Sequence, residues 1–220
     1  MRSFLKFIAP HKTIPNTPWR ADHRWQLSPA RMAILFFGLA IFGLGDSLLV
    51  QGNTGNAPWT VFAQGLSLKT GWALGISTAV ISIAVLLVWI PLRERPGFGT
   101  LANIALIATF IQIGTGIFPL AESFALGVAY DLVGIALVGI GSALYITCGL
   151  GPGPRDGMMT GLHLRTGVRV GRVRLAIELS VLAIGWLMGG TVGVGTVLFA
   201  LLIGNSIAIS LGIVARLTSR

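Results

Sequence analysis

The stretch Gly149-Leu-Gly-Pro-Gly-Pro-Arg-Asp-Gly-Met-Met-Thr-Gly161 decides how this chain folds. It places three glycines and two prolines within six residues, and an arginine and an aspartate follow. Gly153 suits the N-cap of a helix and Pro154 its first position. Asp156 then lies in the first turn, where the helix dipole favours a negative charge. The stretch predicts a helix over Pro154–Thr166 of about 20 Å, too short to cross a hydrocarbon core of about 30 Å.

The composition is that of an integral membrane protein. Of the 220 residues, 54% are hydrophobic and 10% are charged, and the mean hydropathy is +0.82. A soluble domain carries about 25% charged residues. The single cysteine, Cys148, excludes an internal disulfide and a multi-cysteine metal site. The net charge of +9 does not indicate nucleic acid, because the basic residues lie at the ends of apolar runs.

The apolar runs predict six transmembrane helices, and two shorter helical runs lie between them. Residues 1–30 form a basic, proline-rich tail, and residues 215–220 form the C-terminal end. One short run ends near Thr70, and the other is the helix over Pro154–Thr166. Pro91 is expected to close the second span. The expected spans are Met32–Gln51, Trp72–Ile90, Thr100–Phe118, Phe124–Thr147, Val173–Met188 and Thr196–Val214.

The basic residues orient this scheme. With the N-terminus inside, 15 of the 16 lysines and arginines lie on one side, and only Lys69 lies on the other. Loops that carry lysine and arginine stay in the cytoplasm. The sequence therefore predicts a multi-pass protein of the bacterial inner (plasma) membrane with both termini in the cytoplasm.

The two halves of the chain repeat one another at a shift of 96 residues. Residues 38–71 and 134–167 align without a gap and share 12 identities in 34 positions, where chance gives about three. Each half holds three spans and a short helix, and three is odd, so the second half enters the membrane from the opposite face. We therefore expect an all-α polytopic protein of two inverted repeats, residues 31–119 and 124–214. Each short helix is either re-entrant or interfacial.

These motifs resemble those of the YczE/YyaS/YitT family of bacterial membrane proteins, on the YczE side. Gly149–Leu162 and Arg165–Gly167 carry the resemblance, which covers residues 31–212. In that family the matching first-half motif reads Gly-Leu-Gly-x-x-Pro-Trp-Asp. Here Asn53 replaces its first glycine and Thr60 its aspartate, so only the second-half acid of a symmetric pair remains. The resemblance implies a multi-pass membrane protein and specifies no activity. Weaker matches are Gly55–Val61, Trp89–Arg93 and Gly189–Thr196.

The expected binding site lies where the two short helices begin, if their positive N-terminal ends meet in a shared cavity. Asp46 is an acid inside a span, which is costly and marks a functional site or a water-filled vestibule. Several of these residues have an alternative explanation. Asp156 and Arg155 suit helix capping and membrane orientation, and Trp59 suits an interfacial anchor. The candidate substrate-binding residues are Asp156, Arg155, Asn56, Thr60, Asp46, Gly151, Gly153 and Trp59.

Other polar residues have structural explanations. Arg174 and Glu178 are four residues apart and suit an ion pair on one helix face. Asn103 suits a hydrogen bond between helices. Asp131 lies near the outer start of the fourth span or within it.

Two classes of function follow from this pattern. The first is a secondary transporter or channel for a small polar or anionic solute, working by alternating access around a central site. The second is an accessory protein that docks a partner through its arginine-rich inner loop, and a third reading is lipid handling through a lateral opening. The sequence holds no motif of a hydrolase, metalloprotease or P-loop enzyme and implies no cofactor or metal. The bilayer is the expected partner, and a homodimer or a protein partner stays open.

Overall fold

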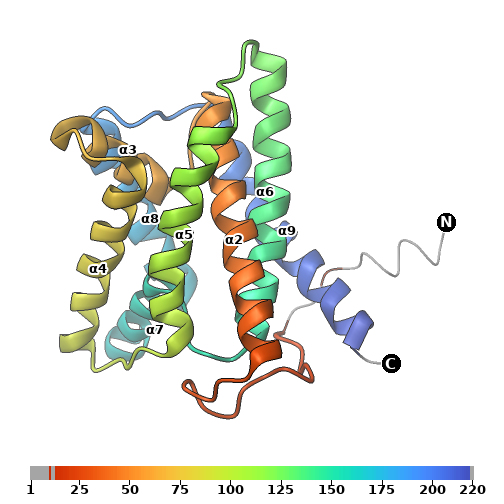
Figure 1. Ribbon diagram of the computed structural model, residues 1–220. Helices are drawn as coiled ribbons and strands as arrows, with labels where there is room; N and C mark the ends of the chain where they lie inside the picture. The colour runs from red at the N-terminus through yellow and green to blue at the C-terminus, as the bar shows by residue number, and fades with distance from the viewer. Residues whose placement is uncertain (1–9, 11–12, 219–220) are drawn as a thin grey trace.

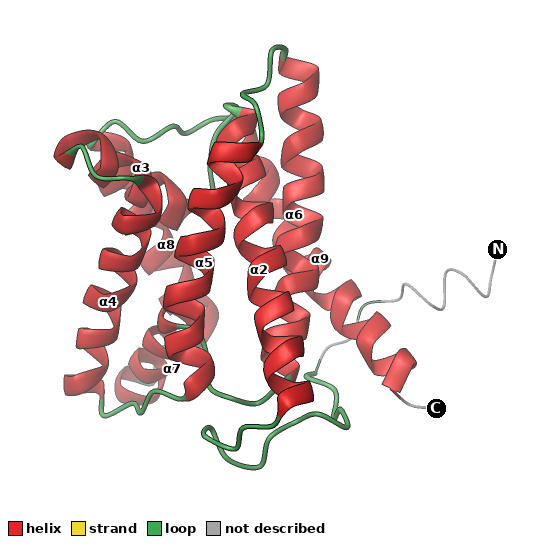
Figure 2. Ribbon diagram, in the orientation of Figure 1, coloured by secondary structure: helices red, strands yellow, loops and turns green. Residues whose placement is uncertain are grey.

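The computed structural model describes residue 10 and residues 13–218. Within this part of the chain, helices joined by loops make up the fold (Figures 1 and 2). The helices are α2 (Pro29–Gly52), α3 (Pro58–Thr70), α4 (Leu74–Leu92), α5 (Phe98–Ile117), α6 (Phe124–Thr147), α7 (Pro154–Thr166), α8 (Val170–Leu187) and α9 (Val194–Thr218).

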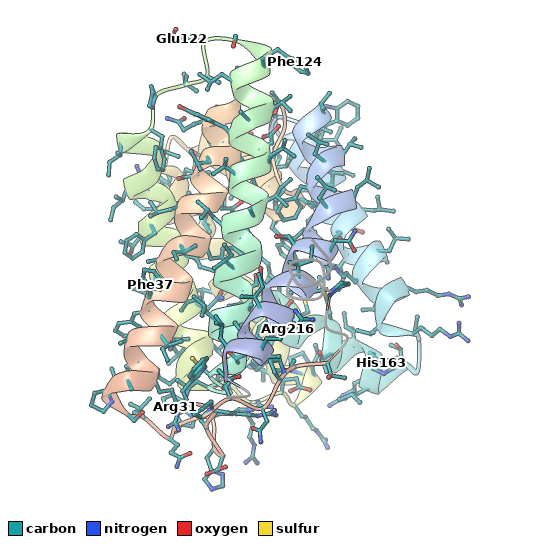
Figure 3. The ribbon with its side chains drawn as sticks, turned by 90° about the vertical axis from the view of Figure 1, so that its right-hand side faces the viewer. Arg31, Phe37, Glu122, Phe124, His163 and Arg216 are labelled. Atoms are coloured by element: carbon teal, nitrogen blue, oxygen red, sulfur yellow. The ribbon has the colours of Figure 1, made fainter. Side chains whose placement is uncertain are left out.

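Five of the described helices, α2, α4, α5, α6 and α9, are long and apolar enough to cross a membrane. They run between the same two ends of the molecule, and Figure 3 places Arg31 at one end and Phe124 at the other. The expected fifth span is present as the 18-residue helix α8. Its first half carries Arg172, Arg174 and Glu178, so α8 is not among the five. The chain is therefore an all-helical, multi-pass membrane protein.

The short helices lie where the sequence predicted them. Helix α7 runs over Pro154–Thr166 with Gly153 as its N-cap, and α3 ends at Thr70. Most boundaries of the expected spans differ from prediction by a few residues, and two of the helix ends show why. Helix α4 passes Pro91 and ends at Leu92, because a proline in the final turn removes only one backbone hydrogen bond. Helix α9 continues beyond Val214 to Thr218, because neither glycine nor proline stops it there.

The predicted shift of 96 residues recurs in the helix positions. The short helices begin at Pro58 and Pro154, 96 residues apart, and both end in a glycine with positive φ. Helices α5 and α9 begin at Phe98 and Val194, again 96 residues apart. The two halves of the chain therefore form the same series of helices.

Helices α2 and α6 pack through glycines at the centre of the molecule. A Cβ atom at Gly45 would lie 2.8 Å from the carbonyl oxygen of Gly134, and a Cβ at Gly134 would lie 2.6 Å from that of Gly45. Gly38 and Gly141 face each other in the same way. Small residues let two backbones approach closely, which drives helix association in a bilayer.

We expect Gly45→Ile to lower stability by about 2 kcal/mol, because its side chain would press on the backbone of α6. The matched control is Gly116→Ile on α5, where a Cβ would meet nothing within 4 Å. Thermal unfolding in detergent measures both variants. Equal midpoints would show that the close packing of α2 and α6 does not contribute to stability.

Each short helix packs against a long helix of the other half. Trp89 of α4 donates a hydrogen bond from Nε1 to the carbonyl oxygen of Pro154 at 2.9 Å, and its ring covers Gly157 of α7. In the other half, Gly185 of α8 lies against the backbone of Val61 and Phe62 in α3. The start of each short helix is thereby held by both halves.

The described part of the N-terminal tail is anchored at the end of α6. The amide of Ala21 donates to the carbonyl oxygen of Cys148 at 2.9 Å, and the hydroxyl of Thr17 donates to that of Thr147 at 3.1 Å. Residues 1–9 and 11–12 of the predicted tail lie outside the described residues.

We expect the thiol of Cys148 to resist maleimide labelling near neutral pH. Burial raises the pKa of this thiol to about 12, with a small opposing effect of Arg31. The thiolate is the reactive form, so labelling is expected only after denaturation. Mass spectrometry before and after unfolding checks this, and rapid labelling of the folded protein would contradict it.

Candidate functional site

A cavity of about 280 Å³ lies between the two halves, where α3 and α7 begin. The N-terminal turns of both short helices line it, so two helix ends with partial positive charge face one space. Its polar lining residues come from several helices and are surrounded by apolar ones. The lining residues are Phe42, Ala57, Pro58, Trp59, Ser82, Asn103, Ile107, Val138, Ser142, Tyr145, Ile146, Gly153, Pro154, Arg155, Asp156, Met159, Arg174, Glu178, Phe199, Ile203 and Ile207.

Most of the lining consists of residues that occupy equivalent positions, 96 apart, in the two halves. Each short helix contributes its proline and the residues on either side of it. The cavity therefore lies where the two halves meet, and both build it from the same part of their fold. The equivalent pairs are Phe42 and Val138, Ala57 and Gly153, Pro58 and Pro154, Trp59 and Arg155, Ser82 and Glu178, Asn103 and Phe199, and Ile107 and Ile203.

Arg155 is the central cation of the site. Its guanidinium carbon lies 5.0 Å from the centroid of the Trp59 ring, which is a cation–π contact. A cation in the first turn of a helix is opposed by the helix dipole. Burial also disfavours the charged guanidinium, and the attraction of Asp46 and Asp156 acts against these two effects. The arrangement holds a positive group at the cavity wall with one planar face on an aromatic ring.

Asp46 and Asp156 are the two acids with the strongest effect on Arg155, and they come from different halves and different helices. In the first half, Asp46 of α2 is buried and accepts a hydrogen bond from the hydroxyl of Thr60 in α3, at 3.0 Å to each carboxylate oxygen. The positions equivalent to these two hold Ser142 in α6 and Asp156 in α7. The acid and the hydroxyl have thus exchanged helices between the halves.

The second acid is held by a tyrosine. Tyr145 of α6 donates from its hydroxyl to Oδ2 of Asp156 at 2.7 Å. Both residues line the cavity, and Asp156 keeps an exposed surface, whereas Asp46 is only 2% exposed. Asp156 is the acid that a bound solute would reach.

Comparison with known proteins places this fold in a family. The chain matches the family of unknown function DUF6198 over residues 29–211. The chain belongs to the DUF6198 family. An uncharacterized protein of Haemophilus influenzae is 45% identical over 206 residues, which cover 94% of each chain. The uncharacterized membrane protein YczE of Bacillus subtilis is 34% identical, over 82% of this chain and 85% of the relative.

A third relative, the uncharacterized protein YyaS of Bacillus subtilis, is 29% identical over 81% of this chain and 91% of its own. The resemblance to YczE-like membrane proteins is therefore confirmed. No solved structure matches the chain.

The structure of this DUF6198 member divides the predicted site residues into two groups. Arg155, Asp156, Gly153 and Trp59 line the cavity. The other four are not among its lining residues: three have side-chain hydrogen bonds, although Oδ1 of Asn56 accepts none within the described residues, and the fourth is a glycine where the backbone turns. These are Asp46, Thr60, Asn56 and Gly151.

Two of those four have a clear structural role. The amide of Asn56 donates from Nδ2 to Oε1 of Gln64 at 2.8 Å, and that same oxygen accepts from the amide of Thr191 at 2.7 Å. Gly151 has φ of 111° and lies against Thr100 and Gly97. Only glycine adopts this φ readily, so Gly151 shapes the entry to α7.

The sequence did not identify the contribution of α6. Ser142 and Tyr145 line the cavity from a span that otherwise looks like a lipid-facing run. Tyr145 could have indicated this contribution, because a buried tyrosine hydroxyl needs a hydrogen-bond partner.

Arg174 and Glu178 form the ion pair that the sequence predicted, with 2.8 Å between Nε and Oε1. They also border the cavity on the side of α8, opposite Phe199 and Ile203 of α9. This ion pair of α8 thus borders the site.

One difference between the halves concerns the wall of the cavity. Helix α4 packs along α5, whereas α8 and α9, at equivalent positions, make little contact within the described residues. A Cβ at Gly75 of α4 would lie 2.5 Å from the carbonyl oxygen of Ala108 in α5. Gly171 and Gly204 are the positions equivalent to Gly75 and Ala108, and a Cβ at either of them would meet no described atom within 4 Å. One side of the cavity is closed by a helix pair and the other is not.

Proposed function

We propose that this protein is a secondary transporter for a small polar solute that carries an anionic group. The observation that supports this most is the cavity that both halves line with equivalent residues, with two helix N-termini and Arg155 at its wall. Transporters built from repeats bind substrates at such a junction. An arginine is suited to carboxylate or phosphate because its planar group donates two parallel hydrogen bonds.

The proposal includes an inverted topology, with both termini in the cytoplasm. The two halves then relate by a pseudo-two-fold axis in the membrane plane, and α3 and α7 enter the bilayer from opposite faces. Helix α8 serves as the fifth of six spans in chain order, because it takes the position of α4. Its Arg174 and Glu178 are paired, which lowers the cost of placing charges in a membrane.

In the proposed mechanism, close packing alternates between the α4–α5 pair and the α8–α9 pair. In the present arrangement α4 is packed on α5, and α8 stands off α9. The alternate state would have α8 packed on α9 and α4 released from α5. Because the halves have the same helices, the two-fold rotation that exchanges the halves relates one state to the other. The cavity then opens to one side of the membrane at a time.

The size and lining of the cavity define the solute. About 280 Å³ suits a molecule at or below the size of common pocket ligands. Arg155 would hold its anionic group, while Asp156 and Tyr145 would accept or donate hydrogen bonds to a second polar group. A small hydroxy acid or an amino acid has both groups.

Flux in proteoliposomes tests the proposal. Purified protein should accelerate the uptake of radiolabelled hydroxy acids or amino acids over protein-free vesicles, and unlabelled solute should compete. Folded, correctly inserted protein that moves none of a broad panel of small organic acids would refute a transporter of this class.

The lateral side of the cavity supports a second candidate, the handling of a lipid-like substrate. Phe199, Ile203 and Ile207 of α9 form an apolar wall beside the α8 ion pair. An acyl chain would fit between α8 and α9 with its head group at Arg155. Movement of a fluorescent lipid between leaflets, without uptake of any water-soluble acid, would favour this candidate over the first.

A further inference from the structure

A second polar site lies away from the cavity, where α2 ends and α9 begins. Asp131 of α6 is fully buried, and its Oδ2 accepts a hydrogen bond from the hydroxyl of Thr54. The other oxygen, Oδ1, has no hydrogen-bond partner in the described structure. An ionised carboxylate that is buried without a partner is costly, so this oxygen requires an explanation.

Two glycines leave room for oxygen atoms around this carboxylate. A Cβ at Gly195 would lie 2.9 Å from Oδ1 of Asp131, 2.7 Å from Oγ1 of Thr54 and 2.3 Å from the carbonyl oxygen of Gly55. A Cβ at Gly52 would lie 3.0 Å from the same Oδ1. Any side chain at either glycine would press on these oxygens, which come from α6 and the loop before α3.

The site has more acceptors than donors. The carbonyl oxygen of Gly55 accepts no hydrogen bond from any described residue, and Oδ1 of Asp131 accepts none. The nearby donor, the hydroxyl of Thr54, is already used on Oδ2. A proton on Asp131 would satisfy one more oxygen, whereas a cation can satisfy several at once.

The other half of the chain shows that packing alone does not require these polar groups. The positions equivalent to Asp131 and Thr54 hold Leu35 and Leu150, which are fully buried in one apolar cluster. The same corner of the fold is therefore stable with two leucines. An acid and a hydroxyl in their place indicate a ligand.

We propose that Asp131, Thr54 and the carbonyl oxygen of Gly55 bind a sodium ion. Oxygen ligands suit a hard cation, and the unwound backbone beside a short helix is where transporters coordinate such ions. One carboxylate matches a single charge, and the described residues hold no group of three acidic, histidine or cysteine side chains that suits a divalent metal. The ion would join the loop after α2 and the first part of α6 beside the start of α9.

Thermal unfolding in detergent tests this, with sodium chloride exchanged for choline chloride at constant ionic strength. Ligand binding to the folded state raises the midpoint. We expect sodium to raise it by about 5 °C for a protein of this size and potassium to have a smaller effect. Asp131→Asn should lose the response, and the exposed acid variant Glu122→Gln should keep it.

The double variant T54L/D131L copies the other half and should fold without a sodium response, which separates loss of the site from loss of the fold. No sodium response in the wild type would overturn the proposal. So would an equal response in Asp131→Asn, or a midpoint that follows pH and not sodium. The measurement needs no transport, so its failure is independent of the failure of the proposed function.

Discussion

Replacement of Arg155 by glutamine should reduce solute flux in proteoliposomes by about 100-fold. A hydrogen bond to a charged group contributes about 1.5–3 kcal/mol, and each 1.4 kcal/mol is about a factor of ten in binding. Arg155 is the cation that the first turn of α7 presents to the cavity, beside Trp59 at the start of α3, so an anionic solute loses its main partner. Arg165→Gln is the matched control, because Arg165 lies in the last turn of the same helix and is exposed.

Arg155→Lys should give an intermediate flux. Lysine keeps the charge but loses the planar group that lies on Trp59 and that binds an oxyanion with two hydrogen bonds. Removing the cation also leaves Asp46 buried without its attraction, so R155Q should be less stable than the wild type. The double variant D46N/R155Q removes both charges and should recover stability without recovering flux. Wild-type flux in R155Q would exclude Arg155 from the solute site.

The sequence was sufficient to predict where the helices lie, because glycine and proline mark their ends. Helix α7 lies over the predicted range since Gly153 and Pro154 start it and Gly167 ends it in the left-handed conformation. The first-half helix α3 ends at Thr70 as expected, and its start at Pro58 agrees with the 96-residue shift. Helix α8 was predicted as a span equal to the others, but its charged first half sets it apart from the five apolar helices.

The site was harder to predict because the chemistry is shared between helices. Aligning the two halves pairs each residue with the one 96 positions later, so Asp46 and Asp156 looked like two unrelated acids in the sequence. In the structure the first is paired with Thr60 and the second lies in the position equivalent to Thr60. A repeat preserves backbone geometry, whereas two facing side chains can exchange their roles. The unequal packing of the α4–α5 and α8–α9 pairs reflects tertiary arrangement, which the helical pattern does not encode.

Cysteines at Gly171 and Ala208 should form a disulfide during transport and stop flux until they are reduced. The equivalent positions in the first half are Gly75 and Gln112, and a Cβ at Gly75 would lie 2.8 Å from that of Gln112. Disulfides need a Cβ separation of about 3.5–4.5 Å, so this contact is close enough with a small shift. In the present arrangement a Cβ at Gly171 meets nothing within 4 Å.

The disulfide would therefore report the alternate state, in which α8 has closed on α9. Solute should speed its formation, because turnover populates that state. The single variants G171C and A208C serve as controls, and the buried Cys148 adds no background. If both cysteines label freely with maleimide but never cross-link, α8 does not close on α9. If the cross-linked protein transports at the wild-type rate, closure happens but is not part of the cycle, and the exchange of helix pairs is wrong.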